Sequence, residues 1–394
     1  MNKQKVCWKI TTKCNQGCKY CFGFTNIPEL SYTDNEKVID NLVNNGINHI
    51  TWTGGEAVLY PRLNDLIKYS KSKGVYNKLV TNGIFLSKND NEYTEDVLNS
   101  LDEINLSIDS ISNDINVELG KSNNHFEIIK GLLEKIKNKP IKIGINTVVS
   151  RKNINKIDEL GEFLNEYKIE KWKFLKFMPI REKSLENKNL FEITEKELEE
   201  KVNKLRKFEN IKLVQYKKQN EFEKSIVILP NADIIKTENG KDISLGNALK
   251  DKKINIDWSC IMSKIKTLIA YDDDEIKNNI INILNGIKDV EIVATSKSPE
   301  DTYNKIIEFQ PELVFTKYDF GTNMNGLDII RQSKKALNDN VPAFNFIAKN
   351  IPTEEYMEAK RIIGDKMNTI IREQTEVRYT GIIEDYKEYK KIQL

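Results

Sequence analysis

The sequence predicts an α/β protein in which strands alternate with amphipathic helices in two separate series. Residues 6–177 give six βα repeats, and a second series of five begins at about residue 263. Such alternation implies parallel sheets or barrels joined by right-handed crossovers. Three cysteines, Cys14, Cys18 and Cys21, come directly after the first expected strand. Ligands of such folds bind at the carboxyl ends of the strands, so this is where we expect the site.

The first series sets the expected architecture of the N-terminal part. Strands are expected at residues 6–10, 49–53, 78–81, 104–109, 142–149 and 172–177, and helices near 34–45, 62–73, 92–101, 126–137 and 154–167. Thr33 or Asp34 is the expected cap of the first helix, which Gly46 ends. The less regular segment that follows contains a charged helix at 194–208 and a hairpin of 225–229 with 232–235. We expect that segment to close or extend the first sheet.

The second series has the size of a separate doubly wound domain. Strands are expected at residues 266–271, 290–294, 313–316, 343–347 and 369–371, with helices at 276–287, 299–309, from 326, from 353 and near 382–389. We therefore expect one domain at 1–262, with its core at about 5–180 and an extension at 181–262. A second domain is expected at 263–385, followed by a tail at 386–394.

Composition narrows the function classes. The 394 residues carry a net charge of +2 with 30% charged side chains, which argues against a general nucleic-acid or membrane-surface binder. No apolar stretch follows Lys3 and Lys5, and no run approaches the roughly 20 apolar residues of a membrane span, so we expect a cytoplasmic protein. Five cysteines, three of them clustered, indicate metal binding in a reduced compartment rather than a disulfide framework.

The spacing C-x3-C-x2-C of Cys14, Cys18 and Cys21 indicates an iron–sulfur site. Zinc would require a fourth Cys or His nearby, but His49, His125 and Cys260 are all distant in the sequence. Three thiolates on a four-iron cluster leave one iron open to a small molecule. Cys7 is expected to be an ordinary strand residue, and Cys260 has no assigned role.

These cysteines, with Tyr20 before the last of them and Gly54-Gly55-Glu56 after the second expected strand, resemble the radical S-adenosylmethionine (SAM) superfamily. The resemblance implies a partial (β/α)6 TIM-type barrel, a [4Fe-4S] cluster on the three cysteines, and SAM on the open iron. It also implies that reductive cleavage of SAM gives a 5′-deoxyadenosyl radical, with a reductase or flavodoxin as electron donor. The implied SAM contacts are Gly54, Gly55, Glu56, Asn82, Ser107 and Asp109. Ala57 stands where the family usually has Pro.

Within the superfamily, the region between about residues 14 and 251 resembles viperin and its microbial relatives, which dehydrate nucleotide triphosphates. The resemblance is carried by residues 104–110, 116–120, 146–151 and 171–173. The positions that it assigns to substrate are His49, Lys121, Asn146, Lys171 and Lys173. His49, Gly144 and Lys121 replace cationic residues of the family, two Lys and one Arg, which weakens the expected triphosphate grip. His49 is also explained as a buried strand histidine, and Lys171 and Lys173 as a solvated strand edge.

The second series resembles response-regulator receiver domains, which have a flavodoxin-like (βα)5 fold. Asp272 and Asp273 match the acids that bind Mg²⁺, and Lys317 stands where receivers carry the phosphorylated aspartate. Ile347 or Ala348 occupies the switch position, and Arg372 the position of the family's Lys. A lysine among the acids would pair with them and displace the metal. We therefore expect a degenerate receiver that serves docking, dimerisation or regulation; in the alternative, Asp319 is phosphorylated.

Three functions remain open on the sequence alone. The first is a radical SAM enzyme acting on a small molecule, specifically a nucleotide. The second is a radical SAM enzyme acting on a peptide or another small molecule, against which the absence of a Cys-rich C-terminal region counts. The third is a two-component regulator whose cluster senses redox state, although only about nine residues follow residue 385, too few for a DNA-binding domain. None of the three requires nucleic acid or a membrane.

Overall fold

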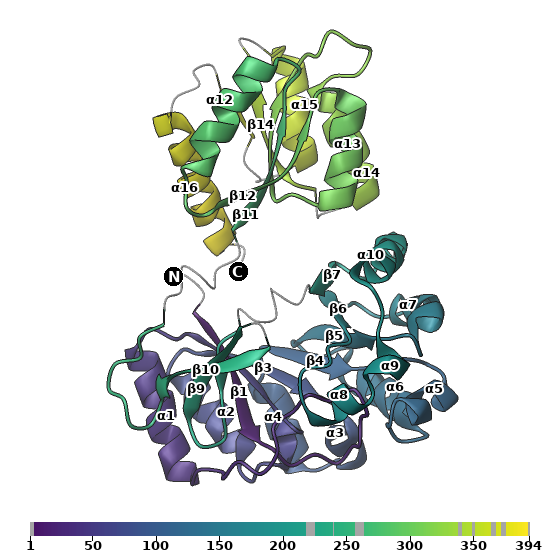
Figure 1. Ribbon diagram of the computed structural model, residues 1–394, viewed down its shortest axis with the longest axis vertical. Helices are drawn as coiled ribbons and strands as arrows, with labels where there is room; N and C mark the ends of the chain where they lie inside the picture. The colour runs from purple at the N-terminus through teal and green to yellow at the C-terminus, as the bar shows by residue number, and fades with distance from the viewer. Residues whose placement is uncertain are drawn as a thin grey trace. The chain divides into compact units, whose positions relative to one another are not determined.

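The computed structural model describes residues 4–217, 225–238, 240–256, 264–337, 341–348, 351–363, 368–371 and 376–392. Two compact units are present, one formed by Lys3–Ile261 and the other essentially by Met262–Leu394 (Figure 1). Cys260 and Arg372, both mentioned above, lie outside the described residues. In the part of the chain that is described, no helix is long and apolar enough to cross a membrane.

The first unit is organised by a ten-stranded open sheet in the order β10-β9-β8-β1-β2-β3-β4-β5-β6-β7. Its six central strands are parallel and adjacent in chain order: β1 (Lys5–Thr11), β2 (His49–Gly54), β3 (Tyr76–Thr81), β4 (Glu103–Ser107), β5 (Lys142–Val149) and β6 (Lys171–Lys176). All six expected strands are therefore present. The fourth ends at Ser107, two residues earlier than expected, so Asp109 lies in the loop beyond it.

Strands from the predicted extension, residues 181–262, are added to this sheet at both edges. β7 (Val214–Lys217) adds parallel to β6, while β8 (Val227–Ile228) adds parallel to β1. The predicted hairpin around residues 230 and 231 is formed by β8 and β9 (Asp233–Glu238), and β10 (Lys241–Asn247) continues it. β7 and β10 were not predicted, because neither segment has a strong apolar alternation.

Helices cover one side of the first sheet and follow it in chain order (Figure 1). They are α1 (Tyr32–Asn44), α2 (Leu63–Ser72), α3 (Ile84–Lys88), α4 (Glu92–Ser100), α5 (Asn113–Glu118), α6 (His125–Ile136), α7 (Ile157–Leu164) and α10 (Glu195–Lys204), with 3-10 turns at Ala57–Leu59, Ile154–Lys156 and Leu205–Lys207. Two short helices, α8 (Glu182–Glu186) and α9 (Lys188–Phe191), lie instead against the segment of residues 19–22. The cap of α1 is Ser31, whose hydroxyl accepts the Asp34 N–H, rather than Thr33 or Asp34. This shifts the start of the helix two residues earlier than expected.

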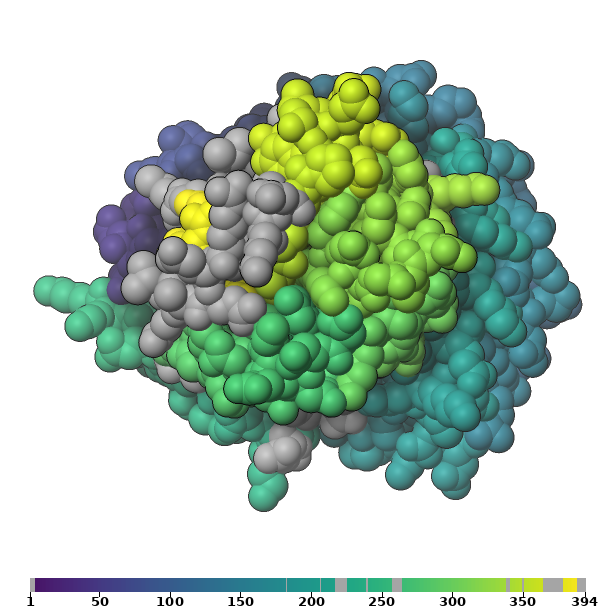
Figure 2. Space-filling view, turned by 90° about the horizontal axis from the view of Figure 1, so that it is seen from above, coloured from purple at the N-terminus to yellow at the C-terminus, as the bar shows by residue number. Residues whose placement is uncertain are grey.

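The second unit has a five-stranded parallel sheet in the order β12-β11-β13-β14-β15. Its strands are β11 (Ile265–Ala270), β12 (Val290–Ser296), β13 (Leu313–Lys317), β14 (Ala343–Ile347) and β15 (Asn368–Ile371), and its helices are α12 (Asp274–Asn285), α13 (Pro299–Phe309), α14 (Gly326–Leu337), α15 (Thr353–Ile363) and α16 (Glu376–Ile392). One core packs α13, α14 and α15 against the sheet and another packs α12 and α16, so both faces are covered. Figure 2 views this unit end-on, with the chain running from green at β11 to yellow at α16.

Candidate active site

The cysteine loop, residues 12–31, crosses the carboxyl ends of β2, β3 and β4. At its start, the Gly55 N–H donates to the Thr11 carbonyl at 2.9 Å and the Glu56 N–H to the Lys13 carbonyl at 2.8 Å. A Cβ at Gly54 would lie 2.4 Å from the Thr11 carbonyl oxygen, and one at Gly55 would lie 2.4 Å from that of Lys13. Both glycines are therefore required by the close passage of the loop itself, before any ligand is considered.

Asn82 joins the third strand to this edge. Its N–H donates to Glu56 Oε2 at 2.7 Å, and its side-chain amide donates to Asn15 Oδ1 at 2.8 Å. The His125 ring lies behind it, with Nε2 3.1 Å from the Asn82 carbonyl oxygen. Burial lowers the pKa of His125 to about 2, with a further contribution from Lys121, so the ring is neutral and donates to Asn82 through Nε2. Asn82-Gly83, predicted either as a turn or as a SAM contact, thus links Glu56 to the cysteine loop.

Glu56 has one carboxylate oxygen without a partner. The residue is 2% exposed, and Oε1 has no hydrogen-bond partner in the described structure. Burial raises the pKa of Glu56 to about 7, against the opposing effects of the Asn82 amide, the Thr81 hydroxyl and the Val58 amide. A buried acceptor of this kind is costly unless a ligand donates to it. An ammonium group is a suitable donor, which fits the amino group of SAM.

The three thiols lie in the same loop, with Cys14 and Cys21 exposed and Cys18 partly buried. Cys21 raises the pKa of both other thiols, although burial is the largest cause in each case, so the three are electrostatic neighbours. Among the described residues, no three His, Cys, Asp or Glu side chains are close enough to hold a single metal ion. A four-iron cluster is bound differently, since each thiolate binds its own iron atom. The donor set fits such a cluster and not a single zinc ion.

Asp109, predicted to contact SAM, and Lys121, predicted to contact substrate, form an internal ion pair. Lys121 Nζ lies 2.8 Å from Asp109 Oδ2, and both side chains are 1% exposed. Asp109 Oδ2 also accepts the Tyr20 hydroxyl at 2.5 Å, while Oδ1 accepts the Val148 N–H at 2.8 Å. Both oxygens of Asp109 therefore have protein partners, and the Lys121 side chain is buried. Ser107, predicted beside Asp109, accepts a hydrogen bond from Lys121 through its carbonyl at 3.1 Å.

The sheet face opposite the helices is polar, and we call it the inner face. Alternate residues of a strand point to opposite faces, and Trp8, Trp52, Leu79 and Trp172 belong to the core on the helix side. The alternate positions carry the inner face: Lys5, Cys7 and Lys9 on β1, His49 and Thr51 on β2, Tyr76 and Lys78 on β3, Glu103, Asn105 and Ser107 on β4, Gly144 and Asn146 on β5, and Lys171 and Lys173 on β6. The structure thus brings four of the predicted substrate residues, His49, Asn146, Lys171 and Lys173, onto one face.

Lys78 and Glu103 form a buried pair on the inner face that sequence reasoning missed. Their side chains are 6% and 12% exposed, and Tyr76 donates to Glu103 Oε2 at 3.3 Å. Burial lowers the pKa of Lys78 to about 8, against the effect of Glu103. Burial also lowers the pKa of Lys171, on which Glu103 acts as well, so these groups are close. The sequence did hold one signal for this polar face. Lys5 and Lys9 on the first strand alternate with apolar residues, and Lys78 on the third precedes one, which is the pattern of a strand with one polar face.

His49 and Gly144 stand where the resemblance expects lysine, and the packing around each of them suits the residue that is present. His49 is 2% exposed at the N-terminal end of β2 and stacks on Tyr76, with ring centroids 4.6 Å apart. A Cβ at Gly144 would lie 2.2 Å from Asn105 Oδ1, so the Asn105 side chain fills the space that a longer residue would need. Asn105 in turn donates to Asn146 Oδ1 at 3.0 Å.

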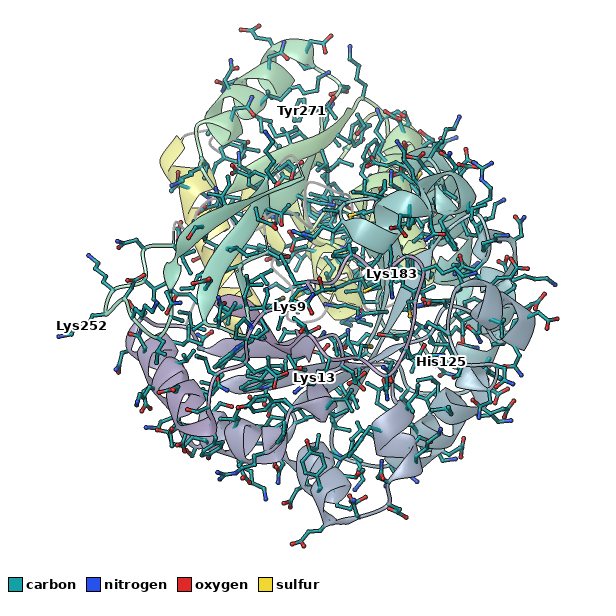
Figure 3. All side chains as sticks on the ribbon, turned by 60° about the horizontal axis from the view of Figure 1, so that its bottom comes forward. Lys9, Lys13, His125, Lys183, Lys252 and Tyr271 are labelled. Carbon is teal, nitrogen blue, oxygen red and sulfur yellow. The ribbon has the colours of Figure 1, made fainter. Side chains whose placement is uncertain are left out.

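Lys9 connects the inner face to the cysteine loop. Its ammonium group lies 4.9 Å from the ring centroid of Phe24 and 5.8 Å from that of Phe22, both just after Cys21. In Figure 3 Lys9 lies near the middle of the unit, whereas His125 lies among the helices at its edge. The positively charged inner face therefore reaches the loop that carries the thiols.

The chain matches the Radical SAM superfamily over residues 8–164. The S-adenosylmethionine-dependent nucleotide dehydratases of Flammeovirga pacifica and Selenomonas ruminantium are 33% identical over 203 residues and 32% identical over 181. These matches cover 48% and 44% of this chain, and 68% and 65% of the relatives. Streptococcus suis SuiB bound to S-adenosylmethionine is similar at 17% identity and a TM-score of 0.48, over 64% of this chain and 62% of that one.

The fold and the match define an α/β enzyme of the radical SAM class. The chain belongs to the radical SAM superfamily, and its relatives include proteins named S-adenosylmethionine-dependent nucleotide dehydratase.

In the second unit, the predicted acid site is occupied by a lysine. Lys317 Nζ lies 3.0 Å from Asp272 Oδ1 and 2.7 Å from Oδ2. Asp273 caps α12, with Oδ1 accepting the N–H groups of Glu275 and Ile276 at 2.9 Å and 3.1 Å. Asp319 is exposed in the next loop, where its Oδ1 accepts the Gly321 N–H at 2.7 Å. Asp272 is therefore paired with a lysine, and one oxygen of Asp273 caps a helix.

Proposed function

We propose that the first unit binds a [4Fe-4S] cluster through Cys14, Cys18 and Cys21 and uses SAM to act on a nucleotide. When bound, the cluster supplies the electron that cleaves SAM to methionine and a 5′-deoxyadenosyl radical. A flavodoxin or reductase provides that electron. The observation that carries the proposal is the buried Glu56 carboxylate, which lies beside the loop of three thiols with one oxygen still without a partner.

The chain's own residues have separate tasks in this proposal. Glu56 Oε1 accepts a hydrogen bond from the SAM ammonium group, and Asn82 holds the other oxygen in place. Gly54 and Gly55 allow the cysteine loop to pass directly against Glu56. Ser107 remains a proposed SAM contact at the end of β4, whereas Asp109 holds the loop instead of the ligand.

The positive charge of the inner face suits a phosphorylated substrate. Lys5, Lys9, Lys78, Lys171 and Lys173 share this face, and Glu103 is the carboxylate among them. Cations gathered in a partly buried setting suit a polyphosphate, whose charge needs several of them. Lys5 and Lys9 of β1 and Lys78 of β3 thereby supply the positive charge that is lost where His49 and Gly144 replace lysine. Relatives named nucleotide dehydratases supply the reaction class: loss of water from a nucleotide.

For the second unit we propose a receiver-like module, spanning 263–385, that no longer accepts a phosphoryl group. Lys317 neutralises Asp272, and Asp273 is engaged as a helix cap, so the usual divalent cation has no free carboxylate pair. The strand order β12-β11-β13-β14-β15 supports a flavodoxin-like doubly wound fold. Its role is then docking to a partner or to a second copy of the chain.

The test is anaerobic reconstitution with iron and sulfide, followed by dithionite, SAM and a panel of nucleoside mono-, di- and triphosphates. We expect 5′-deoxyadenosine from the native chain, increased by the correct nucleotide, together with a product lighter by one water. Cys18→Ala should abolish both products, and Glu56→Gln should raise the KM for SAM by at least tenfold. Lys152→Met, at an exposed surface pair with Glu118, is the matched control and should behave as native. No 5′-deoxyadenosine above the Cys18→Ala background would refute the proposal.

A further inference from the structure

A side-chain amide fills the middle of the inner face. Asn105 lies on β4 between Glu103, which pairs with Lys78, and Ser107 at the carboxyl end of the strand. Its amide occupies the space beside Gly144 on β5, where a Cβ would lie 2.2 Å from Asn105 Oδ1 and 2.8 Å from its Cγ. The position at which the resemblance expects a lysine is therefore closed to a side chain, and an uncharged group stands there instead.

One polar atom of this amide has no partner. Asn105 is 0% exposed, and its Nδ2 donates to Asn146 Oδ1 at 3.0 Å. Its Oδ1 accepts no hydrogen bond from any residue that the structure describes. Asn146 is partly exposed, so the two amides lie where the packed sheet meets the exposed part of the inner face. A buried oxygen without a donor is costly and rare in native proteins, which indicates that a ligand supplies the donor.

The chemistry of a carboxamide oxygen limits what it can bind. It is a neutral acceptor, so it needs an N–H or O–H group and gains nothing from a phosphate oxygen, which is itself an acceptor. In a nucleotide, the donors are the hydroxyls of the sugar and the N–H groups of the base. Asn105 lies two residues, roughly 7 Å, along β4 from Glu103 and thus from the level of the Lys78 ammonium group. With the phosphates at the lysines, the part of the nucleotide joined directly to phosphate, the sugar, reaches Asn105.

We propose that Asn105 is a specificity-determining residue whose Oδ1 accepts a hydrogen bond from a hydroxyl of the nucleotide's sugar, while the lysines of the inner face hold the phosphates. The inference rests on the proposed function of the first unit, which acts on a nucleotide. Gly144 belongs to the same arrangement, because only a residue without a Cβ leaves room for the amide. The site then selects against the analogue that lacks the contacted hydroxyl, since that analogue leaves the buried oxygen unpaired.

The test is equilibrium dialysis of the whole chain, without SAM, against a labelled ribonucleoside triphosphate, its 2′-deoxy and 3′-deoxy analogues, and a ribonucleotide with another base. We expect the native chain to bind one deoxy analogue at least about tenfold more weakly than the ribonucleotide. Asn105→Ala should bring that ratio close to one. Gly144→Ala, which pushes the amide aside without removing it, should lower the ratio as well. Lys152→Met, at the exposed pair with Glu118, is the control and should keep the native ratio.

Inorganic tripolyphosphate probes the lysines alone. It should compete with the nucleotide equally well in the native chain and in Asn105→Ala, because the amide does not bind phosphate. Weaker competition in the variant would overturn the inference and assign Asn105 to the phosphates. A change in the preference for the base, with the preference for the sugar unaltered, would overturn it in favour of a donor on the base.

A purely structural role of Asn105 would weaken the ribonucleotide and both deoxy analogues by the same factor, and this outcome also refutes the inference. Each ratio compares ligands on one preparation, so a partial loss of folded protein does not change it. If the native chain binds no nucleotide at all, the proposed function fails together with this inference. If the native chain binds the nucleotide but Asn105→Ala keeps the native ratio, only this inference fails.

Discussion

The ammonium group of Lys317 bridges both carboxylate oxygens of Asp272, at 2.7 Å and 3.0 Å. The two side chains are 28% and 37% exposed, so the pair contributes at most about 1 kcal/mol to stability. In the proposed receiver-like module, the Lys317 ammonium group would stand where receivers bind a metal ion. The Lys317 ammonium group also lies 5.6 Å from the ring centroid of Tyr271, which further restricts it.

Removing this lysine should restore metal binding. In Lys317→Asp, the new carboxylate and Asp272 face each other without a cation, and we expect Mg²⁺ to bind with a millimolar Kd, measurable by isothermal titration calorimetry. The native chain should show no heat of Mg²⁺ binding in the second unit. Lys297→Ala, which frees Asp274 of one exposed partner, is the control and should leave the titration flat. Magnesium binding by the native chain at similar affinity would contradict the degenerate-site proposal.

Gly55 is expected to tolerate no side chain. Its added Cβ would lie 2.4 Å from the Lys13 carbonyl oxygen and 2.7 Å from that of Thr12, both of which are backbone atoms. We expect Gly55→Ala to destabilise the first unit by roughly 1–3 kcal/mol and to reduce the iron retained after reconstitution. Gly17→Ala is the matched control in the same loop, because its Cβ would meet only the Gly120 carbonyl at 3.7 Å. Equal iron retention in both variants would show that the close passage is not needed.

Glu56 gives the apoprotein a defined pH dependence. Its pKa of about 7 lies above the ordinary 4.5, so the folded state holds the proton more tightly than the unfolded state. This contribution to stability is present at low pH and is lost between about pH 4.5 and 7, by on the order of 3 kcal/mol. Glu56→Gln should therefore gain stability relative to the native apoprotein between pH 5 and pH 8. Urea unfolding by tryptophan fluorescence reports on this unit, because Trp8, Trp52 and Trp172 are buried in it.

His125 gives stability the opposite pH dependence, and its variant can be measured in the same experiment. Its pKa of about 2 lies below the ordinary 6.5, so the neutral form is favoured in the folded state. The stability that it contributes is present above pH 6.5 and is lost as the pH falls. His125→Asn should accordingly gain stability relative to the native apoprotein as the pH falls from 7 to 5. A difference from native that does not vary with pH in either variant would rule out the assigned charge states.

The prediction of the site depended on local patterns. The cysteine spacing, Gly54-Gly55-Glu56 and the strand periodicity each depend on neighbouring residues, and the structure brings the loop, Glu56 and Asn82 together at one edge. The pairing of Asp109 with Lys121 was not predicted, because these residue types suit both a ligand contact and an ion pair. The contact with Tyr20, which comes from 89 residues away, is tertiary and has no local signal in the sequence.

Lys78 and Glu103 were missed for a related reason. The period-two spacing of polar residues on a strand indicates that they share a face, but it does not show which residues of the neighbouring strands they meet until the register is known. The register pairs Lys78 with Glu103 and places Lys171 opposite Gly144. The edge strands β7 and β10 could not be predicted because they gain their stability from the sheet that they extend rather than from their own sequence.

The buried pair of Lys78 and Glu103 gives the sharpest test of the substrate class. Lys78→Met removes one inner-face cation, and we expect it to weaken nucleoside triphosphate binding at least tenfold, about 1.4 kcal/mol. Glu103→Gln removes the opposing carboxylate, so the same nucleotide should bind more tightly, by several-fold. Equilibrium dialysis with labelled nucleotide measures both, with Lys152→Met as the exposed control. If Lys78→Met binds normally while Glu103→Gln binds less, then the carboxylate contacts the ligand, and the inner face does not hold phosphate.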